Sequence, residues 1–167
     1  MTASAEPAIG IFEPARSGAE DTELTRSLAY RLVVLAERVS RAIADTYEET
    51  FELSRPEWRV LAALAANGAM TAKDLGPYST LDKMQVSRAI QGLESAGYVE
   101  RRQAENDKRS NILRLTPGGE ALYRQIRPRV SAREADILAA LSPQERVALG
   151  DMIGRLRERV ETLSEAR

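Results

Sequence analysis

The chain has 167 residues with neither cysteine nor histidine, which excludes thiol redox sensing, imidazole acid–base chemistry and the usual zinc sites. Its 43% hydrophobic and 29% charged residues are typical of a folded globular protein rather than a disordered one. The net charge of -1 does not exclude a nucleic-acid partner, because the first 25 residues carry -4 and leave +3 for the rest of the chain.

Two predicted segments precede the centre of the chain. Residues 1–22 mix Ala, Pro, Gly, Ser and acidic residues without a period, which predicts a flexible N-terminal arm. Docking of its few apolar residues onto the rest of the molecule is the alternative. From Leu24, apolar residues recur at three- and four-residue steps, so one long amphipathic helix is expected to about Glu49.

A second helix is predicted from a local start signal. Ser54 and Glu57 stand three residues apart, where each side chain can accept a hydrogen bond from the other's backbone N–H. Apolar residues follow at helical spacing. Asn67-Gly68 is expected to end this helix.

A short helix, a turn and a longer helix follow. Thr71 is expected to cap a short helix through Leu75, and Gly76-Pro77 to form the turn after it. The longer helix is expected over residues 81–96, with Gly97 ending it in the left-handed conformation. Its apolar stripe comprises Val86, Ala89, Ile90 and Leu93.

The opposite face of the helix predicted at 81–96 is mainly polar. It carries a cation, a hydroxyl and an amide, the groups that hydrogen-bond DNA bases and phosphates. An ordinary solvated helix face is the alternative explanation of this pattern. The residues of this helix predicted to contact DNA are Lys83, Met84, Gln85, Ser87, Arg88 and Gln91.

A β-hairpin is predicted after this helix. Two short segments, residues 98–102 and 111–115, flank a polar tip over residues 103–110. Residues 101–114 carry five cations. Such a tip suits a DNA minor groove, where a narrow groove concentrates negative potential and attracts arginine.

Three residues of the tip are predicted to act together. Lys108 and Arg109 are expected to contact DNA, and Asp107 is expected to orient the guanidinium of Arg109. A surface ion pair is the alternative for Asp107 and Arg109, and it would contribute only about 0–1 kcal/mol to stability.

Two helices are predicted at the C-terminal end. Thr116-Pro117 supplies a cap and a first-turn proline for a helix through about Leu141, in which Pro128 is expected to cause a kink. The run Ser-Pro-Gln-Glu at 142–145 predicts the start of a last helix. Its apolar stripe is Leu149, Met152, Ile153, Leu156, Val160 and Leu163.

The hairpin carries a family resemblance. Residues 107–116, DKRSNILRLT, resemble the wing signature D-x-R-x-x-x-x-x-L-T of the MarR family, the multiple antibiotic resistance regulators, and match it at all four fixed positions. The stretches QVSRAI at 85–90 and GYVER at 97–101 also resemble the reading helix and first wing strand of that family. The resemblance covers about Leu24 to Leu163 and leaves out the N-terminal arm.

This resemblance implies a mainly α-helical fold with a small β-hairpin wing. A winged helix-turn-helix lobe is expected at 51–116 and a helical dimerisation region at 23–50 and 117–167. The resemblance also implies an obligate dimer on a palindromic operator. The apolar stripes of the first and last helices suggest a homodimer independently, because one small lobe cannot cover both. Packing of these helices on each other within one chain is the alternative.

The resemblance further implies release from DNA by a small organic ligand. Family members that sense peroxide do so through a cysteine, which this chain lacks. An aromatic carboxylate or its coenzyme A thioester is a plausible ligand only by analogy with catabolic regulators in the family. Ligands bind in the family where the pairing helices meet the DNA lobe, and ordinary core packing is the alternative for aromatic residues there. The residues expected at that place are Tyr30, Arg38, Tyr47, Trp58 and Tyr123.

The sequence therefore predicts a transcription regulator whose partners are double-stranded operator DNA, a second copy of the chain and a small effector. An enzyme is disfavoured because the sequence has no nucleophile–base pair, metal-ligand set or phosphate-binding glycine loop, and no cofactor is expected. No membrane span or signal peptide is apparent, which favours the cytoplasm. The competing function is a winged-helix module that binds protein instead of DNA, against which the wing cations argue.

Overall fold

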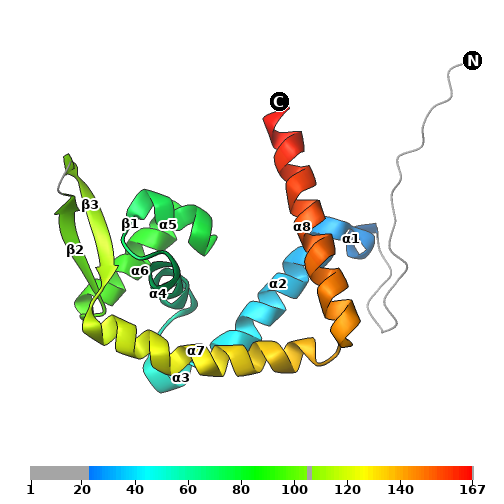
Figure 1. Cartoon of the computed structure of the whole chain (residues 1–167), viewed down its shortest axis with the longest axis horizontal. Coiled ribbons are helices and arrows are strands. Elements are labelled where there is room, and N and C mark those ends of the chain that lie inside the picture. Colours follow the sequence, from blue (N-terminus) through cyan, green and yellow to red (C-terminus); the bar gives the residue numbers. More distant parts are fainter. Residues whose placement is uncertain (1–22, 105–106, 167) are drawn as a thin grey trace, which may run out of the picture.

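The computed structural model describes residues 23–104 and 107–166. Figure 1 shows a lobe of short helices and a small sheet, from which long helices extend to one side. The elements in chain order are α1 (Glu23–Arg26), α2 (Leu28–Ala44), α3 (Glu48–Phe51), α4 (Arg55–Asn67), β1 (Met70–Thr71), α5 (Ala72–Ser79), α6 (Lys83–Ser95), β2 (Val99–Ala104), β3 (Asp107–Leu115), α7 (Pro117–Leu138) and α8 (Pro143–Glu165).

The predicted fold class is confirmed, with one addition in the sheet. The described strands form an antiparallel sheet in the order β1-β3-β2, in which Val99 pairs with Leu115. The hairpin strands are longer than predicted and reach Ala104 and Asp107. The short strand β1 was not predicted, because it is defined by pairing of Met70 and Thr71 with Leu113 and Ile112, far along the chain.

The single long helix predicted from Leu24 to Glu49 is wrong. The chain forms α1, α2 and α3 instead, with breaks at Ser27 and after Ala44. At the second break the Thr46 hydroxyl donates to the Ile43 carbonyl at 2.7 Å, a local bond that competes with helix continuation. The turn lets the side chain of Tyr47 enter the core, where it is buried.

The turn predicted at Gly76-Pro77 is also wrong, because both residues lie inside α5. Tertiary packing extends the helix, since Leu75 and Ser79 are buried and the Ser79 hydroxyl donates to the Leu75 carbonyl at 2.7 Å. The helix ends at Thr80, which has φ 54° in the left-handed region. A β-branched residue rarely adopts this conformation, which costs on the order of 1–3 kcal/mol.

Helix starts were predicted more accurately than helix lengths. The capping boxes Ser54/Glu57 and Ser142/Glu145 are both present, and Thr71 and Thr116 cap α5 and α7. The helix predicted to run to Leu141 ends at Leu138 and continues through Pro128.

The hydrophobic core lies in the lobe and in the first half of α7. Helix α4 packs on α5, α6, β3 and α7, and α6 also packs on α5 and β2. The most completely buried side chains come from α4, α5, α6, β3 and α7. They include Leu61, Leu75, Leu93, Leu113 and Ile126. The reading helix proposed from the sequence is therefore fixed to the lobe along its whole apolar stripe.

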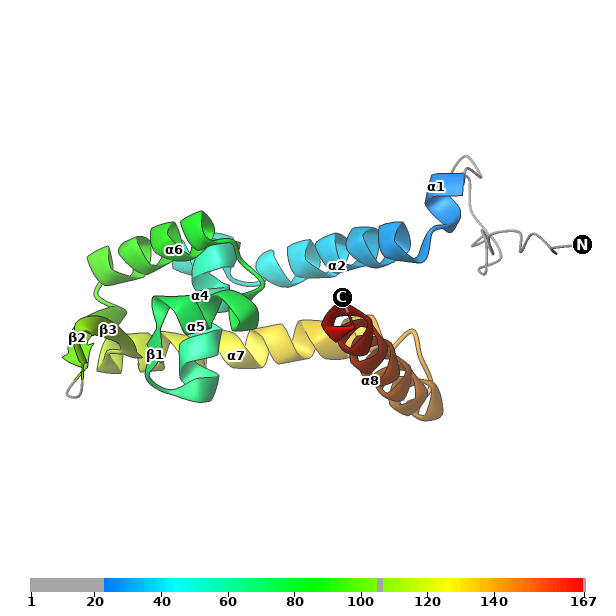
Figure 2. The same ribbon diagram turned by 90° about the horizontal axis from the view of Figure 1, so that it is seen from above.

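The long helices leave apolar side chains exposed. Figure 2 shows α2 and α7 extending from the lobe to the same side, with α8 following at the far end of α7. Helix α8 buries none of its residues, and its Ile153 and Val160 are 56% and 62% exposed. On α2, Leu32 and Leu35 are likewise exposed. Within the described residues, no helix has the length and apolar character needed to span a membrane.

Candidate nucleic-acid interface

Helix α6 presents a continuous exposed face. Its apolar stripe is buried as predicted, at Val86, Ala89, Ile90 and Leu93. The opposite side combines positive charge, hydroxyl, amide and thioether groups, the types of group that contact base edges and phosphates. All six residues predicted on this helix are exposed, namely Lys83, Met84, Gln85, Ser87, Arg88 and Gln91.

The start of α6 is fixed by a capping box that the sequence analysis did not identify. The Asp82 carboxylate accepts from the Gln85 N–H at 2.8 Å, and the Gln85 side-chain carbonyl accepts from the Asp82 N–H at 3.1 Å. Two of the backbone donors at the helix start are thereby satisfied. The carbonyl of Gln85 is therefore engaged in holding the helix start.

Close packing holds α6 on α4. A Cβ atom built at Gly92 would overlap the carboxylate end of the Glu57 side chain, so a larger residue there would require that side chain to move. At the other end, Gly97 has φ 74° and ends α6 in the left-handed conformation, as predicted. The close contact of Gly92 with Glu57 places α6 directly against α4, and Gly97 sets where α6 ends.

The wing is joined to α6 by a two-bond ion pair. The Arg101 guanidinium on β2 donates to both carboxylate oxygens of Glu94, each at 3.0 Å. Hydrogen bonding to Glu94 raises the pKa of Arg101 further above its ordinary value. Two parallel hydrogen bonds between a guanidinium and a carboxylate fix the orientation of the two groups relative to each other. The backbone of β3 includes Asp107, Lys108 and Arg109, but their side chains lie outside the described part of the chain.

Two fixed positions of the wing signature have structural roles. Leu115 pairs with Val99 at the base of the hairpin. Thr116 caps α7 by accepting from the Gly119 N–H at 3.1 Å, and its hydroxyl donates to the Gly97 carbonyl at 2.7 Å. The Leu-Thr end of the signature therefore joins the end of α6, the wing and the start of α7.

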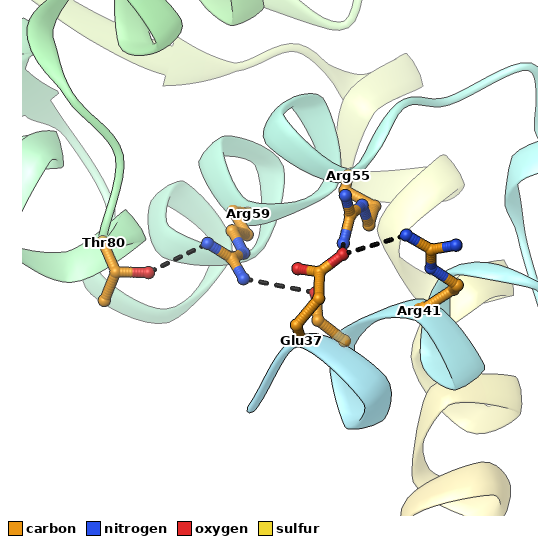
Figure 3. A network of polar contacts seen from close by, with 6 residues as sticks. Glu37, Arg41, Arg55, Arg59 and Thr80 are labelled. Atoms are coloured by element: carbon orange, nitrogen blue, oxygen red, sulfur yellow. Dashed lines mark hydrogen bonds and ion pairs between the residues drawn. The ribbon is translucent and has the colours of Figure 1, made fainter. Parts of the chain in front are cut away.

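A polar network joins the lobe to α2 (Figure 3). Glu37 of α2 accepts from Arg55 of α4 at 2.9 Å and from Arg41 at 3.3 Å. One turn further along α4, Arg59 donates to the Ser40 hydroxyl of α2 at 3.2 Å and to the Thr80 hydroxyl at 3.0 Å. Arg59 is thus bonded both to α2 and to the turn before α6.

The charge of Glu37 is stabilised within this network. Hydrogen bonds from Arg55 and then Arg41 lower the pKa of Glu37 below its ordinary value of 4.5. Because the folded-state pKa is the lower one, the pair stabilises the fold above the unfolded-state pKa. That stabilisation is lost as the pH falls through the lowered value, so the link between α2 and α4 stays intact near neutral pH.

The residues predicted to bind a ligand do not form one group. Trp58 lies between Tyr47 and Tyr123, with ring centroids 5.4 Å and 5.7 Å apart respectively. Tyr47 and Trp58 are buried, and burial together with nearby Glu48 raises the pKa of Tyr47 to about 12. Tyr30 and Arg38 are exposed on α2. The ordinary core role therefore accounts for Tyr47 and Trp58.

Tyr123 also lines a groove between α4, β3 and α7. The groove is lined by small or apolar residues, including Leu64, Ala65 and Leu115, and by charged residues. Its charged residues are Arg114, Glu120 and Arg124. Among the described residues, no group of three or more acidic residues could hold a metal ion.

Sequence reasoning missed three features in the helices and the turn that precede α6. Tyr78 is exposed on α5, a helix that was predicted to end at Leu75. The bonds of Arg59 join positions 19 and 21 residues away, so no local pattern could indicate them. The left-handed conformation of Thr80 also has no sequence signal, because glycine or asparagine is the usual residue there.

Comparison with known proteins gives a consistent result. The model of the MarR family matches residues 53–110. The chain is 33% identical over 109 residues to an uncharacterized HTH-type transcriptional regulator, YwoH, of Bacillus subtilis, covering 65% of this chain and 79% of YwoH. It is 32% identical over 100 residues to the HTH-type transcriptional regulator FarR of Neisseria gonorrhoeae, covering 60% and 68% of the two chains.

A solved structure extends the similarity over most of the chain. The crystal structure of NadR in complex with 4-hydroxyphenylacetate superposes with a TM-score of 0.67 at 26% identity. The match covers 86% of this chain and 97% of NadR, so it includes the long helices as well as the lobe.

Proposed function

The chain belongs to the MarR family of helix-turn-helix transcription regulators, and from this premise we propose that it is a repressor. A homodimer binds a palindromic operator through α6 and the wing, and a small organic ligand releases it. The observation that carries the proposal is the exposed face of α6, which is rigidly positioned beside the wing by Glu94 and Arg101. A helix held in this way can enter a major groove in one orientation.

The proposal divides the chain by role. Residues 51–116 form the DNA-binding region, and residues 23–50 with 117–167 form the dimerisation region. The exposed apolar stripes of α2 and α8 support this division, because contiguous apolar surface of this kind marks interaction sites. A second copy of the chain covers both stripes and places two α6 helices about 34–36 Å apart, in successive major grooves.

Each DNA-contacting residue has a proposed role. Ser87, Arg88 and Gln91, in the middle of the exposed face of α6, contact base edges or adjacent phosphates, and Met84 supplies apolar contact near the helix start. Lys83 contacts phosphate, and Gln85 mainly holds the helix start. In the wing, Lys108 and Arg109 contact the minor groove and Asp107 orients Arg109.

Footprinting the DNA upstream of the protein's own gene tests this function. We expect a protected site with two-fold symmetry and half-site centres about 10 base pairs apart, because a symmetric dimer places its reading helices one DNA turn apart. A winged-helix module that docks protein through α6 would protect no specific site. Uniform, salt-sensitive protection along the fragment would contradict sequence-specific binding.

We propose further that the ligand is an aromatic carboxylate bound in the groove beside Tyr123. The groove offers an aromatic ring, apolar residues and two cations, Arg114 and Arg124, which outnumber its one acidic residue, Glu120; this lining suits an apolar body with one negative charge. Binding of 4-hydroxyphenylacetate by NadR supports this class of ligand. The ligand weakens DNA binding only if it prefers a conformation of the dimer that fits the operator poorly.

A matched pair of arginine variants tests the ligand site. With 4-hydroxyphenylacetate as the first probe, and benzoate and its coenzyme A thioester as the next, Arg124→Ala should raise the concentration needed for half-release roughly 10-fold by removing a charged hydrogen bond. Arg38→Ala removes the same charge from a second groove, on α2, where Arg38 is one of the residues that the sequence predicted to bind the ligand. If the ligand binds beside Tyr123, this variant should leave the response unchanged. Loss of response only in the Arg38 variant would move the site to α2. If none of the three probes releases the wild-type protein, the proposed ligand class is wrong.

A further inference from the structure

The turn before α6 holds a residue in an unusual conformation. Thr80, with φ 54°, lies directly after α5 and two residues before Asp82, which caps α6. The backbone angles at this residue set the direction in which the chain enters α6. Threonine resists the left-handed region because its Cβ approaches the following carbonyl oxygen, whereas glycine adopts that region freely. Something other than intrinsic preference must hold Thr80 there.

Arg59 supplies that restraint. Its Nη1 donates to the Thr80 hydroxyl at 3.0 Å, and its Nη2 donates to the Ser40 hydroxyl at 3.2 Å. The guanidinium is planar and presents its donors in a fixed fork, so a bond on one side orients the bond on the other. Ser40 therefore positions the donor that holds Thr80.

We propose that Arg59 is a positioning residue for DNA recognition. It fixes the angle between α5 and α6 through Thr80 and makes that angle depend on the position of α2. The proposal rests on the proposed function, in which α2 pairs with a second copy of the chain and α6 enters the operator. A shift of α2 relative to the lobe would then reach α6 through three side chains, Ser40, Arg59 and Thr80.

The same network provides a matched control. Arg55 lies one turn before Arg59 on α4 and also bonds to α2, through Glu37 at 2.9 Å, whereas Thr80 is bonded to Arg59 and not to Arg55 (Figure 3). Arg55→Met and Arg59→Met both remove an arginine from the same helix and both break a link to α2. Only the second variant releases the turn before α6.

The test measures affinity for the operator and for random DNA of the same length, together with the thermal unfolding temperature. Arg59→Met should weaken operator binding roughly 10-fold, the effect of losing one charge-assisted hydrogen bond, and should change random-DNA binding by less than about 2-fold. Arg55→Met should leave the ratio of the two affinities unchanged. Thr80→Val removes the acceptor but keeps the side-chain shape, and should reproduce the loss even if Arg59→Met folds poorly.

Two further variants separate the steps of the proposal. Thr80→Gly removes the conformational penalty, so adding Arg59→Met to it should cost less than about 3-fold in operator affinity. Ser40→Ala should give a smaller loss than Arg59→Met, because only the orientation of the guanidinium is affected.

Several outcomes would overturn the proposal. If Arg59→Met weakens binding to operator and to random DNA equally, Arg59 contributes only its positive charge. If Arg59→Met still lowers operator affinity roughly 10-fold when Thr80 is already glycine, Arg59 does not act through the turn at Thr80. If Ser40→Ala leaves operator affinity unchanged, the position of α2 does not influence α6 through Arg59. If the wild-type chain itself binds the operator no better than random DNA, the proposed function fails before any variant is compared.

Discussion

We expect a chain that ends at residue 141 to remain folded, to be monomeric and to lose specific operator binding. Helix α8 buries none of its residues, and the core cluster ends at Val130, so removing α8 leaves the core of the lobe intact. Loss of dimerisation then separates the two reading helices, and each half-site must be bound alone. Sedimentation gives the mass, circular dichroism the fold and gel shift the operator affinity.

Point variants on α8 sharpen this prediction. Leu156 lies in the exposed apolar stripe and Glu158 lies nearly opposite, two residues further along the helix. Leu156→Arg should weaken dimerisation roughly 100-fold, because it buries an unpaired charge in an apolar interface. Glu158→Arg introduces the same side chain on the other face and should leave the dimer intact. A truncated chain that stays dimeric would place the interface elsewhere.

The second large effect is expected because α6 and the wing are proposed to contact DNA in different ways. Changing a residue that contacts a base edge should cost about 1–3 kcal/mol at one operator position and relax the preference there. Gln91→Ala is the clearest case, because its neutral amide contributes no charge. If Arg88 contacts a base, Arg88→Ala will likewise lose affinity and base preference at one operator position. If Arg88 contacts a phosphate, its variant will weaken binding to all sequences instead.

The wing variant should behave differently. Arg109→Ala is expected to weaken binding broadly and to reduce the slope of log affinity against log salt by about 0.9 for the phosphate contact that is lost. Single-base changes in the operator should affect this variant as they affect the wild type. The measurement is operator affinity across a salt series for the wild type and all three variants. If Arg109→Ala has the same operator affinity and the same salt dependence as the wild type, the wing does not take part in DNA binding. That result would favour the protein-docking function.

Local sequence patterns predicted the parts of the fold that depend on neighbouring residues. Ser54 with Glu57 and Ser142 with Glu145 were recognised because a capping box needs only two residues three apart. The buried stripe and exposed face of α6 followed from helical periodicity in the same way. The candidate interface on α6 was therefore accessible from the sequence alone.

The features that failed depend on contacts between distant residues. Helix α5 runs through Gly76-Pro77 because Leu75 and Ser79 pack into the core, which overrides the local preference for a turn. The break after Ala44 likewise serves the burial of Tyr47, which the periodicity of α2 does not reveal. The burial of Tyr47 and Trp58 was not predictable either, because sequence cannot distinguish a core aromatic from one in a pocket; their role as ligand contacts stays a prediction.

The mass of the full-length chain bound to one footprinted operator tests the central claim most directly. Two copies of the chain must bind one site, because each presents a single α6 and the operator requires two. Light scattering or sedimentation of the complex should give two chains per operator duplex, and a duplex with one half-site scrambled should bind at least roughly 100-fold more weakly. A complex with one chain per operator, bound equally well by the half-site duplex, would contradict the account.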